Sequence, residues 1–132
     1  MRGYITNLED VTRENENFRT VLYTAKHSQL VLMSIKPGEE IGEEVHHLDQ
    51  FIRVEEGEGK AIIDGVEHVV RDGDGIVIPA GARHNVINTS GREALKLYTI
   101  YSPPEHLDGR IHATKADALK DTEDEFDGKT TE

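Results

Sequence analysis

Three residues with metal-ligating side chains lie two and four positions apart in the middle of the chain. They are Glu44, His46 and Gln50, within the stretch G-E-E-I-G-E-E-V-H-H-L-D-Q-F-I-R-V-E-E-G that runs from Gly38 to Gly57. Because side chains alternate with period two along an extended backbone, a strand here would direct all three to one face. A later stretch, G-D-G-I-V-I-P-A-G-A-R-H-N-V-I-N, brings His84 out of a tight Pro-Ala-Gly turn. The four side chains could together hold one metal ion.

This donor set combines oxygen and nitrogen. Glu44 supplies an anionic oxygen, Gln50 a neutral carbonyl oxygen, and His46 and His84 each a neutral imidazole nitrogen. Such a set suits a divalent transition metal (Mn, Fe, Ni, Co or Zn) rather than Cu(I) or an iron–sulfur cluster, and the sequence does not choose among them. Without Gln50, the remaining three form a two-His, one-carboxylate set, which is how non-haem iron oxygenases hold Fe(II).

Each proposed ligand also has a purely structural interpretation. His46 and His84 could be buried, hydrogen-bonded histidines. Glu44 belongs to an acidic run, Glu39, Glu40, Glu43 and Glu44, that could form only a solvated turn. His47 has the opposite parity to His46, so we expect it to face away from the other ligands. His27 and His68 are expected at the surface.

The two stretches resemble the paired motifs of the cupin superfamily, G-x5-H-x-H-x3or4-E-x6-G and G-x5-P-x-G-x2-H-x3-N. The second motif matches at every fixed position, which are Gly73, Pro79, Gly81, His84 and Asn88. The first keeps its spacing, with Glu44 at the position of the first His and Gln50 at the position of the Glu. The resemblance covers about residues 37 to 101.

The resemblance implies an all-β fold, the double-stranded β-helix or jelly-roll barrel of cupins, with an open metal site at the barrel mouth. Small cupins with similar motifs include sugar-phosphate isomerases of the mannose-6-phosphate isomerase kind and Fe(II)-dependent dioxygenases. The alternative to an enzyme is a non-catalytic module that binds or senses a sugar or another small molecule at the metal. Because no Cys or Ser-His-Asp arrangement supports a covalent mechanism, any catalysis should be metal-centred.

The strand pattern derived from the residues agrees with this fold. Short β-branched or apolar runs are separated by turn signals at regular intervals, which is typical of a sandwich or barrel. The expected strands are 19–25, 29–36, 43–47, 50–55, 60–64, 66–70, 75–78, 84–88 and 94–101. Asp64-Gly65 predicts a two-residue hairpin turn. Thr114 and Asp117 resemble a capping box, so a short C-terminal helix is expected over 114–120.

The apolar positions of these strands give the expected core. The residues chosen are Val31, Met33, Ile35, Val54, Ile62, Ile76, Ile78 and Val86. Closing many short antiparallel strands into a barrel hides their edges, and a small barrel can hold a ligand pocket at one mouth.

A second group of functional side chains follows the last core strand. Residues 102–112 begin with a Ser-Pro-Pro sequence that should stiffen the loop. Glu105, His106 and His112 could lean over the barrel mouth as catalytic acid/base or substrate-gating groups. The alternative is that they only pack or solvate the loop.

Length and composition limit the remaining possibilities. With 132 residues the chain is expected to form one domain, with a barrel over about 18–103, an N-terminal arm over 1–17 and a C-terminal loop, short helix and acidic tail over 104–132. A net charge of −11 repels phosphate backbones and anionic membrane surfaces, so neither nucleic acid nor a membrane is expected as a partner. The absence of Cys and of any signal or membrane-spanning segment predicts a cytoplasmic protein.

The two ends of the chain carry separate expectations. Residues 121–132 hold six acidic residues against the single base Lys129 and are expected to form a frayed, solvated tail. A small jelly roll leaves edges and sheet faces to cover, so a homodimer with two-fold symmetry is expected, to which residues 1–17 contribute.

Overall fold

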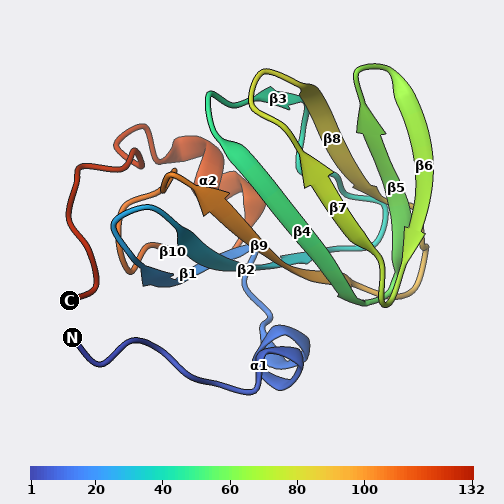
Figure 1. Cartoon of the computed structure of the whole chain (residues 1–132). Helices are drawn as coiled ribbons and strands as arrows, with labels where there is room; N and C mark the ends of the chain where they lie inside the picture. Colours follow the sequence, from blue (N-terminus) through green and yellow to red (C-terminus); the bar gives the residue numbers. More distant parts are fainter.

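Two antiparallel sheets enclose one hydrophobic core in the computed structural model, which describes residues 1–132 (Figure 1). The six-stranded sheet has the order β10-β1-β2-β9-β4-β7. Its strands are β1 (Arg19–Thr24), β2 (Gln29–Ile35), β4 (Asp49–Glu56), β7 (Gly75–Ile78), β9 (Leu95–Ser102) and β10 (Ile111–His112). The four-stranded sheet has the order β3-β8-β5-β6. Its strands are β3 (Glu44–Val45), β5 (Glu58–Ile63), β6 (Val66–Arg71) and β8 (Arg83–Asn88).

This arrangement confirms the predicted all-β barrel with a short C-terminal helix, α2 (Lys115–Lys120). The capping box that predicted α2 is present, because the Thr114 side chain accepts from the Asp117 backbone N–H and the Asp117 carboxylate accepts from that of Thr114. The hairpin turn is confirmed as well. Asp64 and Gly65 both have positive φ, 47° and 81°, as a two-residue turn between β5 and β6 requires.

The core contains seven of the eight residues predicted for it. Each of them lies on the inward face of its strand and is buried in the cluster between the sheets. The exception is Ile62, which is only partly buried. Its neighbour Ala61 is the inward residue of β5, so the alternation of the strand turns Ile62 outward.

A second helix, α1 (Leu8–Glu14), was not predicted from the sequence. Its N-cap is Asn7, whose side chain accepts a hydrogen bond from the Asp10 backbone N–H. The helix packs against β4 and β9, and its Thr12 is buried. Too few apolar residues mark its buried face for periodicity to reveal it. Neither α1 nor α2 has the length and apolar character that a membrane-spanning helix needs.

The prediction of a frayed acidic tail is wrong. Asp124 accepts from the ring of His106 at 2.8 Å and from the Leu107 backbone N–H at 2.9 Å. Thr131 donates its backbone N–H to the carbonyl oxygen of Thr24, and the Glu132 carboxylate accepts from Tyr23 and from the N-terminal backbone. The two termini therefore lie close together (Figure 1). Asp121, Asp124 and Glu132 hold this segment in place, because the carboxylate of each accepts hydrogen bonds from groups outside the segment.

One close backbone approach gives a test of the packing between β5 and β8. A Cβ added at Gly59 would collide with the carbonyl oxygen of Ile87. We therefore expect Gly59→Ala to lower the free energy of unfolding by about 1–3 kcal/mol, measured by urea denaturation. Gly91→Ala is the matched control, since nothing lies within 4 Å of its added Cβ. Equal stability of the two variants would contradict the packing described here.

Candidate metal centre

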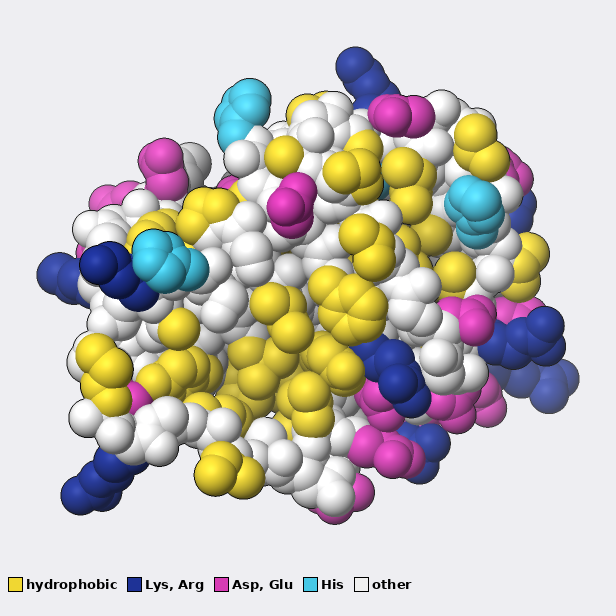
Figure 2. Space-filling view, viewed as in Figure 1, with side chains coloured by type: hydrophobic (Ala, Val, Ile, Leu, Met, Phe, Trp, Pro, Cys, Tyr) yellow, Lys and Arg dark blue, Asp and Glu magenta, His cyan; other side chains and the backbone are white.

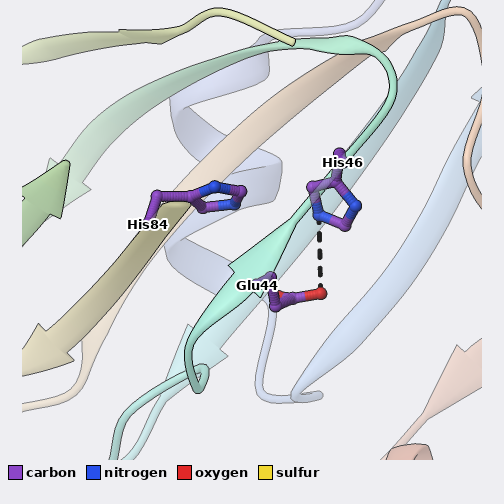
Figure 3. A group of neighbouring side chains, drawn as sticks. All are labelled: Glu44, His46 and His84. Atoms are coloured by element: carbon purple, nitrogen blue, oxygen red, sulfur yellow. Dashed lines mark ion pairs between the residues drawn. The ribbon is translucent and has the colours of Figure 1, made fainter. Parts of the chain in front are cut away.

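The short pairing of β3 with β8 brings two of the predicted ligands together. Glu44 is the direct cross-strand partner of His84, and His46 lies just beyond the end of β3. Figure 3 shows the three side chains. His84 extends from β8 toward His46, and the Glu44 carboxylate lies beside the His46 ring. Ligand atoms from all three lie within 4.8 Å of one another. The sequence prediction that Glu44, His46 and His84 converge is consistent with this grouping.

The separations suit donors to a single ion. His46 Nε2 and Glu44 Oε2 are 3.4 Å apart, and the two imidazole centroids are 5.1 Å apart. Two atoms that each bind one ion at about 2.1 Å lie roughly 3–3.5 Å apart when they occupy adjacent coordination positions. The spacing of Glu44 and His46 therefore needs little adjustment to admit a metal.

A hydrogen bond fixes the orientation of His84. Its Nδ1 lies 3.0 Å from the carbonyl oxygen of Ala82, to which only a protonated nitrogen can donate. The lone pair of the neutral ring is then on Nε2. A metal-ligating histidine commonly donates its other ring nitrogen in this way, which sets both tautomer and direction.

His46 lies between two acidic side chains. Glu44 faces its Nε2, and the Glu105 carboxylate lies 3.6 Å from its Nδ1. Burial lowers the pKa of His46 below its ordinary value, against the opposing attraction of Glu44. The neutral ring that results is the form that binds metals.

Gln50 offers a further oxygen from the neighbouring sheet. The register of β4 and β9 sets it opposite Tyr101, and the Tyr101 ring lies 5.9 Å from that of His46. The buried Gln50 amide donates through Nε2 to Thr99 Oγ1 at 3.0 Å, while its Oε1 has no hydrogen-bond partner. A buried carbonyl oxygen without a donor is suited to a cation, so Gln50 stays the predicted fourth ligand.

Two of the three loop residues predicted for catalysis lie beside these ligands. Burial, together with the charges of Glu44 and Asp124, raises the pKa of Glu105 to about 7. The ring of His106 packs edge-on against Tyr101 at 5.1 Å. Its Nδ1 donates to Asp124, and its buried Nε2 has no partner. Burial lowers the pKa of His106, so the unpartnered nitrogen carries a lone pair.

His112, the third predicted loop residue, is buried on β10 with both ring nitrogens engaged. Its Nε2 lies 2.8 Å from Asp121 Oδ2, and its Nδ1 lies 3.3 Å from the guanidinium of Arg19. His112, Asp121 and Asp124 also present ligand atoms within 4.8 Å of one another. Because Arg110 already binds Asp121 at 2.7 Å and Arg19 contacts His112, two cations lie against this second group, which makes it a poor metal site.

A cavity of about 420 Å³ opens beside the first group, between β1, β3 and α2. Its wall includes Glu44, Glu105 and His106, and the cationic side chains Arg19 and Lys115. A volume of this size suits a small molecule. Arg19 was not predicted as a site residue, because its only signal in the sequence was its place in the strand 19–25. His27, His47 and His68 are exposed, as predicted.

Comparison with known proteins agrees with this architecture. Residues 31–101 match the family described as Cupin domain. The chain is 47% identical over 125 residues to the uncharacterized protein YrkC of Bacillus subtilis, covering 89% of this chain and 67% of that one. An uncharacterized protein of Acanthamoeba polyphaga mimivirus is 46% identical, covering 82% of this chain and 70% of that one. The crystal structure of BH2720 from Bacillus halodurans superposes with a TM-score of 0.87 at 48% identity, covering 89% of this chain and 94% of that one.

The adjacent histidines 46 and 47 allow a matched test of the site. We expect protein purified without chelator, or reconstituted with Mn, Fe, Co, Ni or Zn, to hold about one ion per chain by elemental analysis. His46→Ala and His84→Ala should lose most of this metal, because each removes a ligand. His47→Ala should keep it, since that side chain is exposed. Absence of metal from the wild-type protein after every reconstitution would contradict the site.

Proposed function

The chain belongs to the cupin family, and on that premise we propose that it holds a divalent metal at which a small oxygen-rich molecule binds and is converted. The observation that carries this proposal is the two-His, one-carboxylate group beside an open cavity. Four protein donors would still leave positions free on a metal that prefers six ligands. A purely structural site would instead be closed by the protein.

The residues present fit such a metal. Glu44, His46 and His84 would hold it, with the unpartnered Oε1 of Gln50 as a fourth donor. When bound, the ion would supply Lewis-acid polarisation of a carbonyl or hydroxyl oxygen of the substrate. The protein's part is to keep the His46 imidazole neutral, which its burial supports, and to orient His84 through the hydrogen bond to Ala82.

An isomerase is the enzymatic function that the surroundings of the site support best. Isomerases of the mannose-6-phosphate isomerase kind move a proton between the carbons of a hydroxy-carbonyl unit. Glu105 is the candidate for this task, since its carboxylate lies 3.6 Å from His46 Nδ1 and lines the cavity beside the proposed ligands. A doubly charged phosphate is less well served than a singly charged group, because the cavity wall also carries Glu43, Asp121 and Asp124.

An Fe(II)-dependent dioxygenase is the second candidate. The two-His, one-carboxylate composition of Glu44, His46 and His84 favours it, because non-haem iron oxygenases use this set with open positions. A third possibility is a binding or sensing module that uses the same site without turnover. Consumption of oxygen during turnover separates the first two functions, and binding without turnover indicates the third.

The outward face of the six-stranded sheet supports a homodimer. Leu30, Ile100, Phe51 and Val77 are successive cross-strand partners on β2, β9, β4 and β7, which makes an apolar row across four strands. Figure 2 shows hydrophobic side chains gathered over this part of the molecule. We propose a two-fold symmetric dimer through this face, to which residues 1–17 contribute because α1 packs beside it on β4 and β9.

We also propose a cytoplasmic location, because the chain contains no Cys and so no disulfide bonds.

Replacing Glu105 tests the isomerase proposal. With metal-loaded protein and a hydroxy-carbonyl substrate found by screening sugars and sugar phosphates, we expect Glu105→Gln to lower kcat by about 10²–10⁴-fold. Metal content should be unchanged, because Glu105 is not among the proposed ligands. Glu43→Gln is the control, since Glu43 lines the same cavity but pairs with Arg83 at 3.1 Å. Full activity of Glu105→Gln would rule out its role in proton transfer.

Two equally exposed valines test the proposed dimer. Val77 belongs to the apolar row, whereas Val69 lies on β6 of the other sheet, and each side chain is 70% exposed. By light scattering well above micromolar concentration, we expect the wild-type protein and Val69→Lys to be dimers and Val77→Lys to be a monomer, because a buried lysine without a partner opposes association. A monomeric wild-type protein would refute the dimer.

A further inference from the structure

The wall of the cavity beside the metal centre contains a buried cation without a counterion. Arg19 is only 8% exposed, and its guanidinium packs over the Phe18 ring at 5.3 Å. Its NH1 group contacts His112, and its Nε has no hydrogen-bond partner. No carboxylate oxygen lies within 4.0 Å of the Arg19 guanidinium, the distance limit for an ion pair. Burying an unpaired charge is costly, so this arrangement favours an anion in the cavity.

The carboxylates around the cavity do not fill this role, because each is directed to another partner. Glu43 binds Arg83, Glu44 and Glu105 face His46, Asp121 binds Arg110 and His112, and Asp124 binds His106. Arg19 lines the cavity of about 420 Å³, and its Nε has no hydrogen-bond partner within the protein.

A chain of hydrogen bonds holds Arg19 in place. Because an arginine can only donate, the Nδ1 of His112 must accept from it, and the Nε2 of His112 then donates to Asp121 at 2.8 Å. Asp121 in turn binds Arg110 through two hydrogen bonds, at 2.7 and 3.2 Å. His112 and Asp121 are therefore positioning residues for Arg19. This use of His112 differs from direct acid/base catalysis.

We propose that Arg19 anchors the carboxylate of the substrate, and that the substrate class is a small hydroxy or keto carboxylic acid. The inference rests on the proposed function, because the hydroxyl or keto oxygens of the same molecule would reach the metal held by Glu44, His46 and His84. Arg19 and Glu44 line one cavity, so a single small molecule can meet both. Two donors of a guanidinium match the two oxygens of a carboxylate.

His106 adds a third contact on the same wall. It is 6% exposed, and its bond to Asp124 leaves the unpartnered Nε2 as a hydrogen-bond acceptor. A carboxylate would repel such a lone pair, whereas a hydroxyl would donate to it. The Arg19 guanidinium can only donate hydrogen bonds, and His106 Nε2 can only accept one. Together they fit a molecule that carries both a carboxylate and a hydroxyl group.

The test compares acids with their neutral amides on metal-loaded protein. The affinities of lactate, glycerate and gluconate for the protein are measured by titration calorimetry. Each is compared with the affinity of the matching amide, which is lactamide, glyceramide or gluconamide. We expect at least one acid to bind the wild-type protein roughly tenfold to a hundredfold more tightly than its amide. Arg19→Lys should remove most of this preference while leaving the amide affinity and the metal content unchanged. Arg83→Lys, at an exposed arginine, is the control.

The outcomes distinguish this inference from the proposed function. If metal binds but acids and amides bind equally, if no acid binds, or if Arg19→Lys keeps the preference, the carboxylate anchor is refuted and the metal site stands. A fall in acid and amide affinity together would mean that Arg19 is only structural, and would also refute the anchor. If no metal binds, the proposed function fails, and an acid preference in the metal-free protein that depends on Arg19 would support the anchor alone.

Discussion

The site depends on the pairing of β3 with β8, in which Glu44 lies opposite His84. β3 is only two residues long, so its own ladder is weak and neighbouring contacts must hold it. The Asn85 side chain accepts from the Gly42 backbone N–H at 2.9 Å, and the Gly81 backbone N–H donates to the carbonyl oxygen of His46 at 2.8 Å. The two motifs are thus joined by hydrogen bonds on both sides of the ligands. A shift of one residue would turn Glu44 and His46 to the other face.

The C-terminal segment completes the surroundings of this centre. Asp121 and Asp124 bond to groups on the barrel wall, and through them the segment orients His112 and His106. α2 closes one side of the cavity with Lys115 at its first turn. Asp121 and Asp124 therefore hold the segment against the barrel through specific hydrogen bonds. Because both are engaged in this way, neither forms an ion pair with the buried Arg19.

The sequence predicted the features that local rules determine. Alternation and turn residues located nine strands, and the Asp64-Gly65 turn followed from the need for positive φ. Motif spacing also predicted that Glu44 and His84 would meet. Long-range side-chain pairing escaped prediction, because nothing near Asp124 in the chain indicates that its partner is His106. Arg19 was missed for the same reason, since only the assembled cavity shows that a strand residue is buried without an ion-pair partner.

We propose that a metal ion occupies the centre formed by Glu44, His46 and His84. The most direct test is a crystal structure of metal-reconstituted protein, with data collected on both sides of the absorption edge of the added metal. We expect one anomalous peak per chain at bonding distance from these three side chains, with Gln50 Oε1 directed toward it. A peak at His112, Asp121 and Asp124 instead, or no ordered peak in either group, would contradict it.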